Sequence, residues 1–162
     1  MSKIIIQRAE SKNSPDLTLI SFASKRYWNY PEEYFDVWKQ ELTITPDYIK
    51  NNLVYIAEVE GKITGYFSIV EVKGDFRAGK VLVRKGYWLD HLFIRPEFIG
   101  EGIGTELISF AVNLCGQKSI GRLFIFSDPN AKGFYEKIGA RYIEESASSI
   151  QGRSVLLYEL VI

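Results

Sequence analysis

The chain has 162 residues, of which 46% are hydrophobic and 25% are charged, and these values are ordinary for one soluble globular domain. Its 20 Lys and Arg residues balance 20 Asp and Glu residues, and a formal net charge of zero argues against nucleic acid or an anionic membrane as a partner. One cysteine, Cys115, and one histidine, His91, exclude an internal disulfide framework, a four-thiolate zinc site and a His-rich metal site. We therefore expect a single domain over residues 1–162 that holds no metal.

The same pattern bears on location. No apolar run reaches the roughly 20 residues that a membrane helix needs. The segment Met1–Arg8 lacks the apolar stretch of about 7–15 residues that a signal peptide carries, and it reads as a first strand instead. We therefore expect a cytoplasmic protein without a membrane partner.

The N-terminal third is predicted to contain one strand followed by three helices. Asn13–Asp16 has helix-start chemistry, and apolar residues then recur at helical spacing. The first helix should bury the side that carries Leu17, Ile20, Ala23 and Tyr27, and the second the side that carries Tyr34, Val37, Trp38 and Leu42. The predicted elements are strand Lys3–Arg8, helix Leu17–Trp28, helix Pro31–Leu42 and a short helix from Thr45 to Asn52.

The remainder is predicted to alternate strands with two further helices. Glu60-Gly61-Lys62 indicates a hairpin between two β-rich runs. In chain order we expect strands Leu53–Val59 and Ile63–Val72, a loop Gly74–Gly79, a strand region Val81–Ile94, a helix Gly100–Cys115, a strand Arg122–Phe126, a helix Pro129–Ile138, and strands Arg141–Glu145 and Ser154–Ile162. This order predicts an α/β (α+β) fold with a mixed sheet, not a strict βαβ repeat.

A glycine-rich loop between a strand and an amphipathic helix is the most informative segment. Gly100, Gly102 and Gly104 permit positive φ and leave the backbone accessible to a ligand. The N–H groups at a helix N-terminus lack intrahelical partners, and the helix dipole favours an anion there, so a phosphate fits without any cationic side chain. The spacing lacks the lysine of a P-loop and departs from the dinucleotide-binding fingerprint G-x-G-x-x-G. A glycine-rich turn that binds nothing is the alternative.

Two blocks of sequence resemble the GNAT superfamily of N-acetyltransferases. The segment Ile99-Gly100-Glu101-Gly102-Ile103-Gly104 is similar to the motif A loop [QR]-x-x-G-x-[GA], with Ile99 in place of the usual Arg or Gln. The segment Ser127–Ala140 resembles the motif B helix, N/D-x-x-A-x-x-F-Y-x-x-x-G-[FA]. The resemblance implies a mostly antiparallel sheet of six to seven strands with about four helices, in the order β-α-α-β-β-β-α-β-α-β-β.

The second block also has local helix signals of its own. Asp128 is a good N-cap, Pro129 suits the first helical position and Gly139 suits the C-terminal stop. Ala131, Phe134 and Ile138 should form the apolar face, with Tyr135 at its edge. A half-buried aromatic residue on the flank of a helix is the alternative interpretation of Tyr135.

The resemblance also implies a cofactor and the residues that would bind it. Acetyl-CoA would be the co-substrate, with its pyrophosphate on the backbone at Ile99, Gly100, Glu101, Gly102, Ile103, Gly104 and Thr105. Its pantetheine arm would pair with the strand edge Leu92-Phe93-Ile94, and Asn130 would hydrogen-bond the same arm. Tyr135 would meet the departing sulfur, as an acid or as a hydrogen-bond donor.

The base and the acceptor site are less defined. Asp90 corresponds to a carboxylate that acts through water in polyamine-type GNAT enzymes, whereas His91 has an intrinsic pKa nearer 7. Adjacent strand residues face opposite sides, so at most one should face the acceptor. Tyr27, Trp28 and Tyr30, with His91, are candidate acceptor-binding residues, since aromatic rings beside Glu32 and Glu33 suit a cationic amine. An amphipathic helix with buried rings and solvated carboxylates is the alternative.

We thus expect an N-acetyltransferase that moves an acetyl group to a primary amine, of a small molecule or a protein, in a ternary complex. The alternatives are transfer of a longer acyl chain, a non-catalytic acyl-CoA-binding sensor or regulatory protein of the same fold, and a nucleotide-binding oxidoreductase. The apolar segment Val155–Ile162 would let two copies pair, so a homodimer is one expected assembly.

Overall fold

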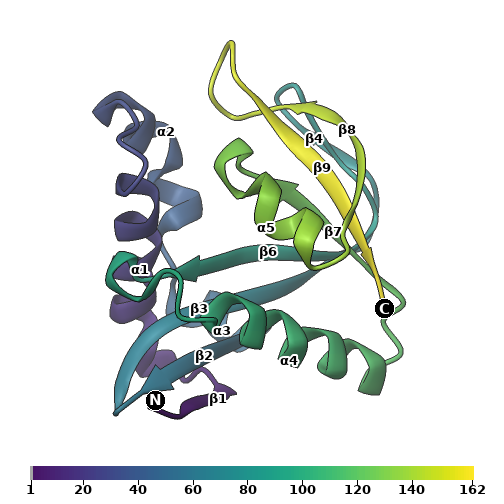
Figure 1. Cartoon of the computed structure of the whole chain (residues 1–162). Coiled ribbons are helices and arrows are strands. Elements are labelled where there is room, and N and C mark those ends of the chain that lie inside the picture. The colour runs from purple at the N-terminus through teal and green to yellow at the C-terminus, as the bar shows by residue number, and fades with distance from the viewer. Residues whose placement is uncertain (1) are drawn as a thin grey trace. The chain divides into compact units, whose positions relative to one another are not determined.

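The computed structural model describes residues 2–162 (Figure 1). The α-helices in this range are α1 Ser14–Arg26, α2 Glu32–Leu42, α3 Pro46–Asn51, α4 Ile103–Gln117 and α5 Lys132–Lys137. The strands are β1 Ile4–Arg8, β2 Leu53–Val59, β3 Lys62–Val72, β4 Phe76–Ala78, β5 Val81–Val83, β6 Gly86–Ile94, β7 Arg122–Ser127, β8 Arg141–Ala147 and β9 Ser154–Val161. Short 3₁₀ turns cover Ser11–Asn13, Pro96–Phe98 and Pro129–Ala131.

Seven of these strands form one sheet in the order β1-β2-β3-β6-β7-β9-β8. The pairs β1–β2, β2–β3, β7–β9 and β8–β9 are antiparallel, and β6 runs parallel to β7. The parallel pair is in register at Tyr87 with Leu123 and at Trp88 with Phe124, close to where both strands begin. The mixed, mostly antiparallel sheet predicted from the sequence is confirmed, with five helices among the described residues instead of about four.

The segment predicted as the loop Gly74–Gly79 contains a strand. Phe76–Ala78 pairs antiparallel with Val81–Val83 as a separate two-stranded sheet, β4–β5. The predicted strand region Val81–Ile94 is therefore divided after Val83 into β5 and β6. In the connection between these two strands, the backbone N–H of Lys85 donates to Asp75 Oδ1 at 2.6 Å. Strands of three residues are too short to show an alternating hydrophobic pattern, and the sequence gives no sign of them for this reason.

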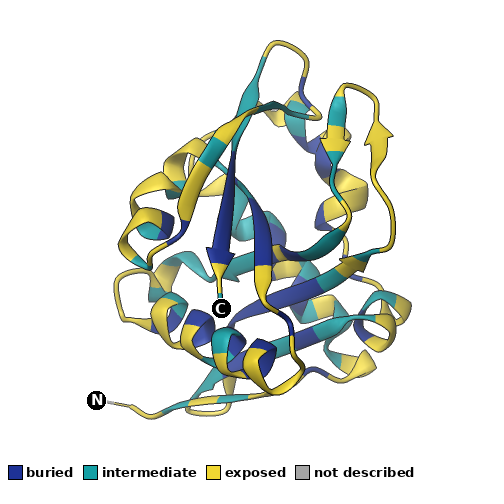
Figure 2. Ribbon diagram, turned by 90° about the vertical axis from the view of Figure 1, so that its right-hand side faces the viewer, coloured by how far each residue is buried: buried dark blue, intermediate teal, exposed yellow. Residues whose placement is uncertain are grey.

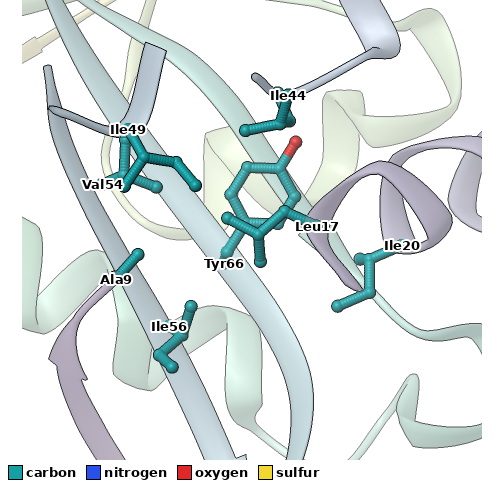
Figure 3. Packing of buried hydrophobic residues seen from close by; sticks show 8 residues of the cluster. All are labelled: Ala9, Leu17, Ile20, Ile44, Ile49, Val54, Ile56 and Tyr66. Atoms are coloured by element: carbon teal, nitrogen blue, oxygen red, sulfur yellow. The ribbon is translucent and has the colours of Figure 1, made fainter. Parts of the chain in front are cut away.

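The chain folds as two compact units. The first comprises the chain up to Ile69 together with His91–Ala111, and the second comprises Val70–Asp90 and Val112–Ile162. In the first unit, side chains from α1, α3, β2 and β3 converge on one core (Figure 3). Its buried members are Ala9, Leu17, Ile20, Ile44, Ile49, Val54, Ile56 and Tyr66. Burying a Leu or Ile side chain contributes about 1.5–3 kcal/mol, so this cluster holds the helices against the strands.

Two side chains of the first unit lie on a different face from the one predicted. Tyr27 follows α1, which ends at Arg26, and 49% of its surface is exposed. Val37 is 51% exposed, whereas Phe35 is buried with Trp38 and Leu42. The positions 35, 38 and 42 lie on one side of a helix with 3.6 residues per turn, and Val37 lies about 100° from Trp38.

The second unit is built around β9. Trp88, Phe124 and Leu157 form its core cluster. Figure 2 shows part of β9 as buried, in agreement with the low exposure of Leu157, Tyr158, Glu159 and Leu160. Among residues 2–162, no helix has the length and apolar character that a membrane crossing requires.

Candidate functional site

The glycine loop precedes α4 and has the backbone geometry that glycine permits. Gly100 and Gly102 have φ of +85° and +83°, a region that residues with a Cβ rarely adopt. Positive φ is incompatible with a right-handed helix, so α4 begins at Ile103 and not at the predicted Gly100. The helix is then continuous to Gln117. The loop therefore ends where the unpaired N–H groups of the first helical turn begin.

The backbone of this loop is open. Gly100, Glu101 and Gly102 are all exposed. Beyond the chain neighbours, no atom of the described chain lies within 4 Å of the position that a Cβ would take at Gly100 or Gly102. Ile99, which stands where the family pattern has Arg or Gln, is 48% exposed. Chemically, the loop offers backbone donors and a helix dipole to an anion, with little help from its own side chains.

The end of β6 leading into this loop is firmly anchored. Arg95 donates its backbone N–H to Thr64 O at 2.7 Å and its Nε–H to Ile63 O at 2.6 Å. Ser24 of α1 donates to Ile94 O at 2.6 Å. Leu92, Phe93 and Ile94 themselves are half-buried. The strand predicted to pair with the pantetheine arm is thus held in place by hydrogen bonds within the first unit.

The two candidate bases are in different environments. His91 is 8% exposed. Its imidazole stacks on the ring of Phe93 with 5.4 Å between the ring centroids, and its centroid lies about 6 Å from those of the Tyr48 and Tyr66 rings. Those two tyrosines hydrogen-bond to Ser68 and Ser21. Asp90 is exposed. The imidazole of His91 is therefore packed among aromatic rings, whereas the carboxylate of Asp90 is accessible to water.

The aromatic residues around the α1–α2 connection differ in exposure and in the rings that they contact. Tyr27 and Trp28 are exposed and contact each other edge to face, with 4.9 Å between ring centroids. Tyr30 instead packs at 5.1 Å against the buried Trp38, and the Lys25 Nζ lies 4.5 Å from the centre of the Trp38 ring. Tyr30 therefore has a ring partner in α2, whereas Tyr27 and Trp28 present exposed rings.

A pocket that the sequence did not predict opens between α1 and α2. It has a volume of about 360 Å³ and is lined by apolar Phe22 and Phe35, by Arg26 and Lys39, and by Glu32, Glu33 and Asp36. The guanidinium of Arg26 binds Glu32 with two contacts of 2.6 and 2.7 Å and lies 4.3 Å from the centre of the Phe35 ring. No periodic pattern links residues on both sides of a helix-helix turn, so only the tertiary structure shows this pocket.

Tyr135 of α5 is more buried than predicted. It is 7% exposed, whereas Phe134 and Ile138, the expected apolar face, are half-buried. The predicted single helix begins as the 3₁₀ turn Pro129–Ala131, which advances about 120° per residue instead of 100° and so rotates the residues that follow. Burial and the negative charge of Asp128 both raise the pKa of the Tyr135 phenol, so it is protonated at any physiological pH.

Asp128 and Asn130 belong to the turn that precedes α5. Asp128 caps the 3₁₀ turn by accepting the backbone N–H of Asn130 at 2.9 Å, and its other oxygen lies 3.7 Å from Arg153. Asn130 is exposed.

Cys115 is buried, and burial raises the pKa of its thiol to about 11. This cysteine is therefore a neutral core residue and not a nucleophile.

Comparisons with known proteins agree with this architecture. A model of the acetyltransferase (GNAT) family matches residues 18–140. The peptidyl-lysine N-acetyltransferase YjaB of Salmonella typhimurium is 27% identical over 137 residues, which cover 80% of this chain and 90% of that protein.

Two solved structures share the fold over nearly the whole chain. A GCN5-related N-acetyltransferase from Rhodopseudomonas palustris superposes with a TM-score of 0.76 at 20% identity, covering 100% of this chain and 98% of that one. The paiA N-acetyltransferase from Thermoplasma acidophilum, in complex with coenzyme A, gives a TM-score of 0.74 at 16% identity and covers 99% of both chains. Together with the family match, the open glycine loop and the sheet order lead to one conclusion: the chain belongs to the GNAT family of acetyltransferases.

Proposed function

We propose that this protein transfers an acetyl group from acetyl-CoA directly to a primary amine while both are bound. The observation that carries the proposal is the open backbone at Gly100 and Gly102, immediately before the first turn of α4. Side-chain-free donors at a helix N-terminus suit the diphosphate of coenzyme A. The residues of this cradle would be Ile99 to Thr105, with Ile99 contributing backbone alone.

The acetyl group needs a fixed position beside the amine. In this proposal the pantetheine arm pairs with Leu92-Phe93-Ile94, a strand segment whose anchoring at Arg95 and Ile94 limits its movement. Asn130 is exposed and able to hydrogen-bond the same arm. Holding the two reactants in this way replaces a bimolecular encounter by a nearly unimolecular step.

The chemical step transfers one acetyl group and one proton. The amine nitrogen attacks the thioester carbon, a backbone N–H near Leu92 stabilises the oxyanion, and the carbon–sulfur bond then breaks. The phenol of Tyr135 donates a hydrogen bond or its proton to the leaving thiolate. Asp90 accepts the proton of the amine through water. The carboxylate of Asp90 is exposed, whereas the imidazole of His91 is buried, so the exposure of the two side chains favours Asp90 for this role.

The acceptor we propose is a lysine side chain of a peptide or a small amine of similar shape. The name of the Salmonella relative supports a lysine. Glu33 and Asp36 line the pocket between α1 and α2 and offer carboxylates to an approaching cation, whereas Glu32 already binds Arg26. The exposed rings of Tyr27 and Trp28 also suit a cation.

The test is a panel of amines assayed with acetyl-CoA, reading the release of the free thiol. It should include lysine peptides, polyamines and peptide N-termini. We expect turnover with lysine peptides or polyamines that exceeds acetyl-CoA hydrolysis by at least about tenfold. Binding of coenzyme A without turnover on any amine would instead favour a non-catalytic acyl-CoA-binding protein.

A further inference from the structure

Helix α5, which carries Tyr135, is too short to hold its own position. It spans six residues, Lys132–Lys137, and isolated helices of this length are not stable in water. Its C-terminal end is closed by local backbone bonds from Ile138, Gly139 and Ala140. Contacts from outside the helix must therefore set the orientation of the Tyr135 ring.

Tyr158 of β9 makes two such contacts. Its hydroxyl donates to Glu136 Oε2 at 2.8 Å, and its ring centroid lies 6.2 Å from that of Tyr135, with the planes 33° apart. Glu136 directly follows Tyr135 in α5. One side chain thus holds the helix by its neighbouring residue and contacts the ring of Tyr135 itself.

The strand that carries Tyr158 is paired with a neighbouring strand on each side. Tyr158 is fully buried and pairs with Ile125 on β7 and with Tyr142 on β8. The next residue, Glu159, is 4% exposed and bridges Arg122 of β7 and Arg141 of β8. Burial and the hydrogen bond to Glu136 raise the pKa of Tyr158 to about 12, so its hydroxyl remains a donor at the pH of any assay.

We propose that Tyr158 is a positioning residue for Tyr135: its hydrogen bond to Glu136 fixes α5 so that the Tyr135 phenol meets the leaving sulfur. This inference rests on the proposed function. It predicts that the Tyr158 hydroxyl matters for turnover only through Tyr135. A hydroxyl that merely stabilised the unit would act whether or not Tyr135 were present.

A double-mutant cycle separates these two cases. Tyr158→Phe keeps the ring and removes the hydrogen bond, and we expect kcat to fall about fivefold to tenfold with the KM for acetyl-CoA within about twofold. In the Tyr135→Phe background the same change should have no further effect on kcat. An equal loss in both backgrounds, or no loss in either, would overturn the proposal.

Two further variants act as controls. Glu136→Gln retains an oxygen that can accept from Tyr158 and should keep most of the turnover, whereas Glu136→Ala should match Tyr158→Phe. The ring of Tyr142 is half-exposed and lies 5.8 Å from the ring of Tyr158, measured between centroids. Tyr142→Phe removes a hydroxyl near Tyr158 but keeps the hydrogen bond from Tyr158 to Glu136, so the turnover of this variant should be unchanged. Loss of turnover in Glu136→Gln equal to that in Glu136→Ala would also overturn the proposal.

An activity-independent measurement distinguishes failure of this inference from failure of the proposed function. In protein labelled with ¹³C at the tyrosine ζ carbon, the Tyr135 signal is identified by its loss in Tyr135→Phe. Tyr158→Phe should shift or broaden that signal, and Tyr142→Phe should not. An unchanged signal overturns the positioning role. A shifted signal combined with full turnover of Tyr135→Phe overturns the chemical role of Tyr135 in the proposed function.

Discussion

At the scale of single residues, burial and a neighbouring charge keep the Tyr135 phenol protonated. Its pKa is raised by burial first and by the charge of Asp128 second. An ordinary phenol, with a pKa of about 10, is already a weaker acid than a thiol. A raised pKa makes full proton transfer to the thiolate still less favourable, which leaves donation of a hydrogen bond as the proposed role of the phenol. In the proposed function, the neutral phenol would therefore stabilise the leaving group without ionising.

Tyr135→Phe tests this role with the smallest change in volume. We expect kcat to fall about a hundredfold, at the low end of what acid–base groups contribute, because the ring remains and one donor is lost. The dissociation constant for coenzyme A should stay within about twofold. Thiol release measures the first quantity and titration calorimetry the second. Full turnover of the variant would show that the sulfur leaves without help from Tyr135.

At the scale of elements, the contact of β3 with the end of β6 requires a glycine. A Cβ added at Gly65 would lie 2.7 Å from Ile94 Cδ1 and 2.8 Å from the backbone oxygen of Phe93. The isoleucine side chain can move, but the carbonyl oxygen belongs to a strand anchored by Arg95. The absence of a side chain at one position of β3 thus fixes where the predicted pantetheine-binding strand lies.

Gly65→Ala should destabilise the protein by about 1–3 kcal/mol, the usual cost of overpacking a core. Gly74→Ala is the matched control, because nothing in the described chain lies within 4 Å of its would-be Cβ. Urea unfolding followed by tryptophan fluorescence measures both free energies. Equal stabilities of the two variants would mean that β6 can shift to make room.

Strand β9 carries a buried carboxylate, that of Glu159, whose two arginine partners are exposed. The carboxylate of Glu159 accepts hydrogen bonds from Arg141 and Arg122, and these bonds hold its pKa below the ordinary value of 4.5 despite the opposing effect of burial. A carboxylate with a lowered pKa in the folded state adds stability above the unfolded pKa, and this stability is lost as the pH falls through the folded value.

Glu159→Gln should therefore cost about 1.5–3 kcal/mol at pH 7, the range for hydrogen bonds to charged groups. The difference from the parent protein should shrink as the pH falls below 4.5. Unfolding free energies at a series of pH values between 3 and 7 provide the comparison. A difference that is constant over this series would exclude ionisation of Glu159 as its cause.

At the scale of the whole molecule, binding of a ligand to the folded chain alone must raise its stability. A ligand at 100 times its dissociation constant adds about 2.7 kcal/mol. For a chain of 162 residues, each kcal/mol raises the melting temperature by about 2–4 °C.

We accordingly expect coenzyme A at saturating concentration to raise the melting temperature by about 5–10 °C, and NAD to leave it unchanged. Thermal unfolding of the intact chain with each ligand is the measurement. A shift with NAD and none with coenzyme A would favour the dinucleotide interpretation of the glycine loop and overturn the proposed function.

The sequence by itself determined the order of the helices and of the strands of the large sheet, the family and the position of the glycine loop, but not the β4–β5 hairpin. These depend on interactions over a few residues: hydrophobic periodicity, helix capping at Thr45, and the backbone conformations that Gly100 and Gly102 permit. Each of these signals involves residues that are close together in the chain, so it can be recognised from the sequence alone.

Only the tertiary structure decided which side chains are buried and which residues contact them. It placed Tyr135 rather than Phe134 in the interior, packed His91 among rings while leaving Asp90 exposed, and packed Tyr30 against Trp38. It also revealed the contact of Tyr158 with Glu136, two residues 22 positions apart. Such contacts depend on the rotation of short helices and on strand register, which small local effects shift, and no spacing in the sequence encodes them.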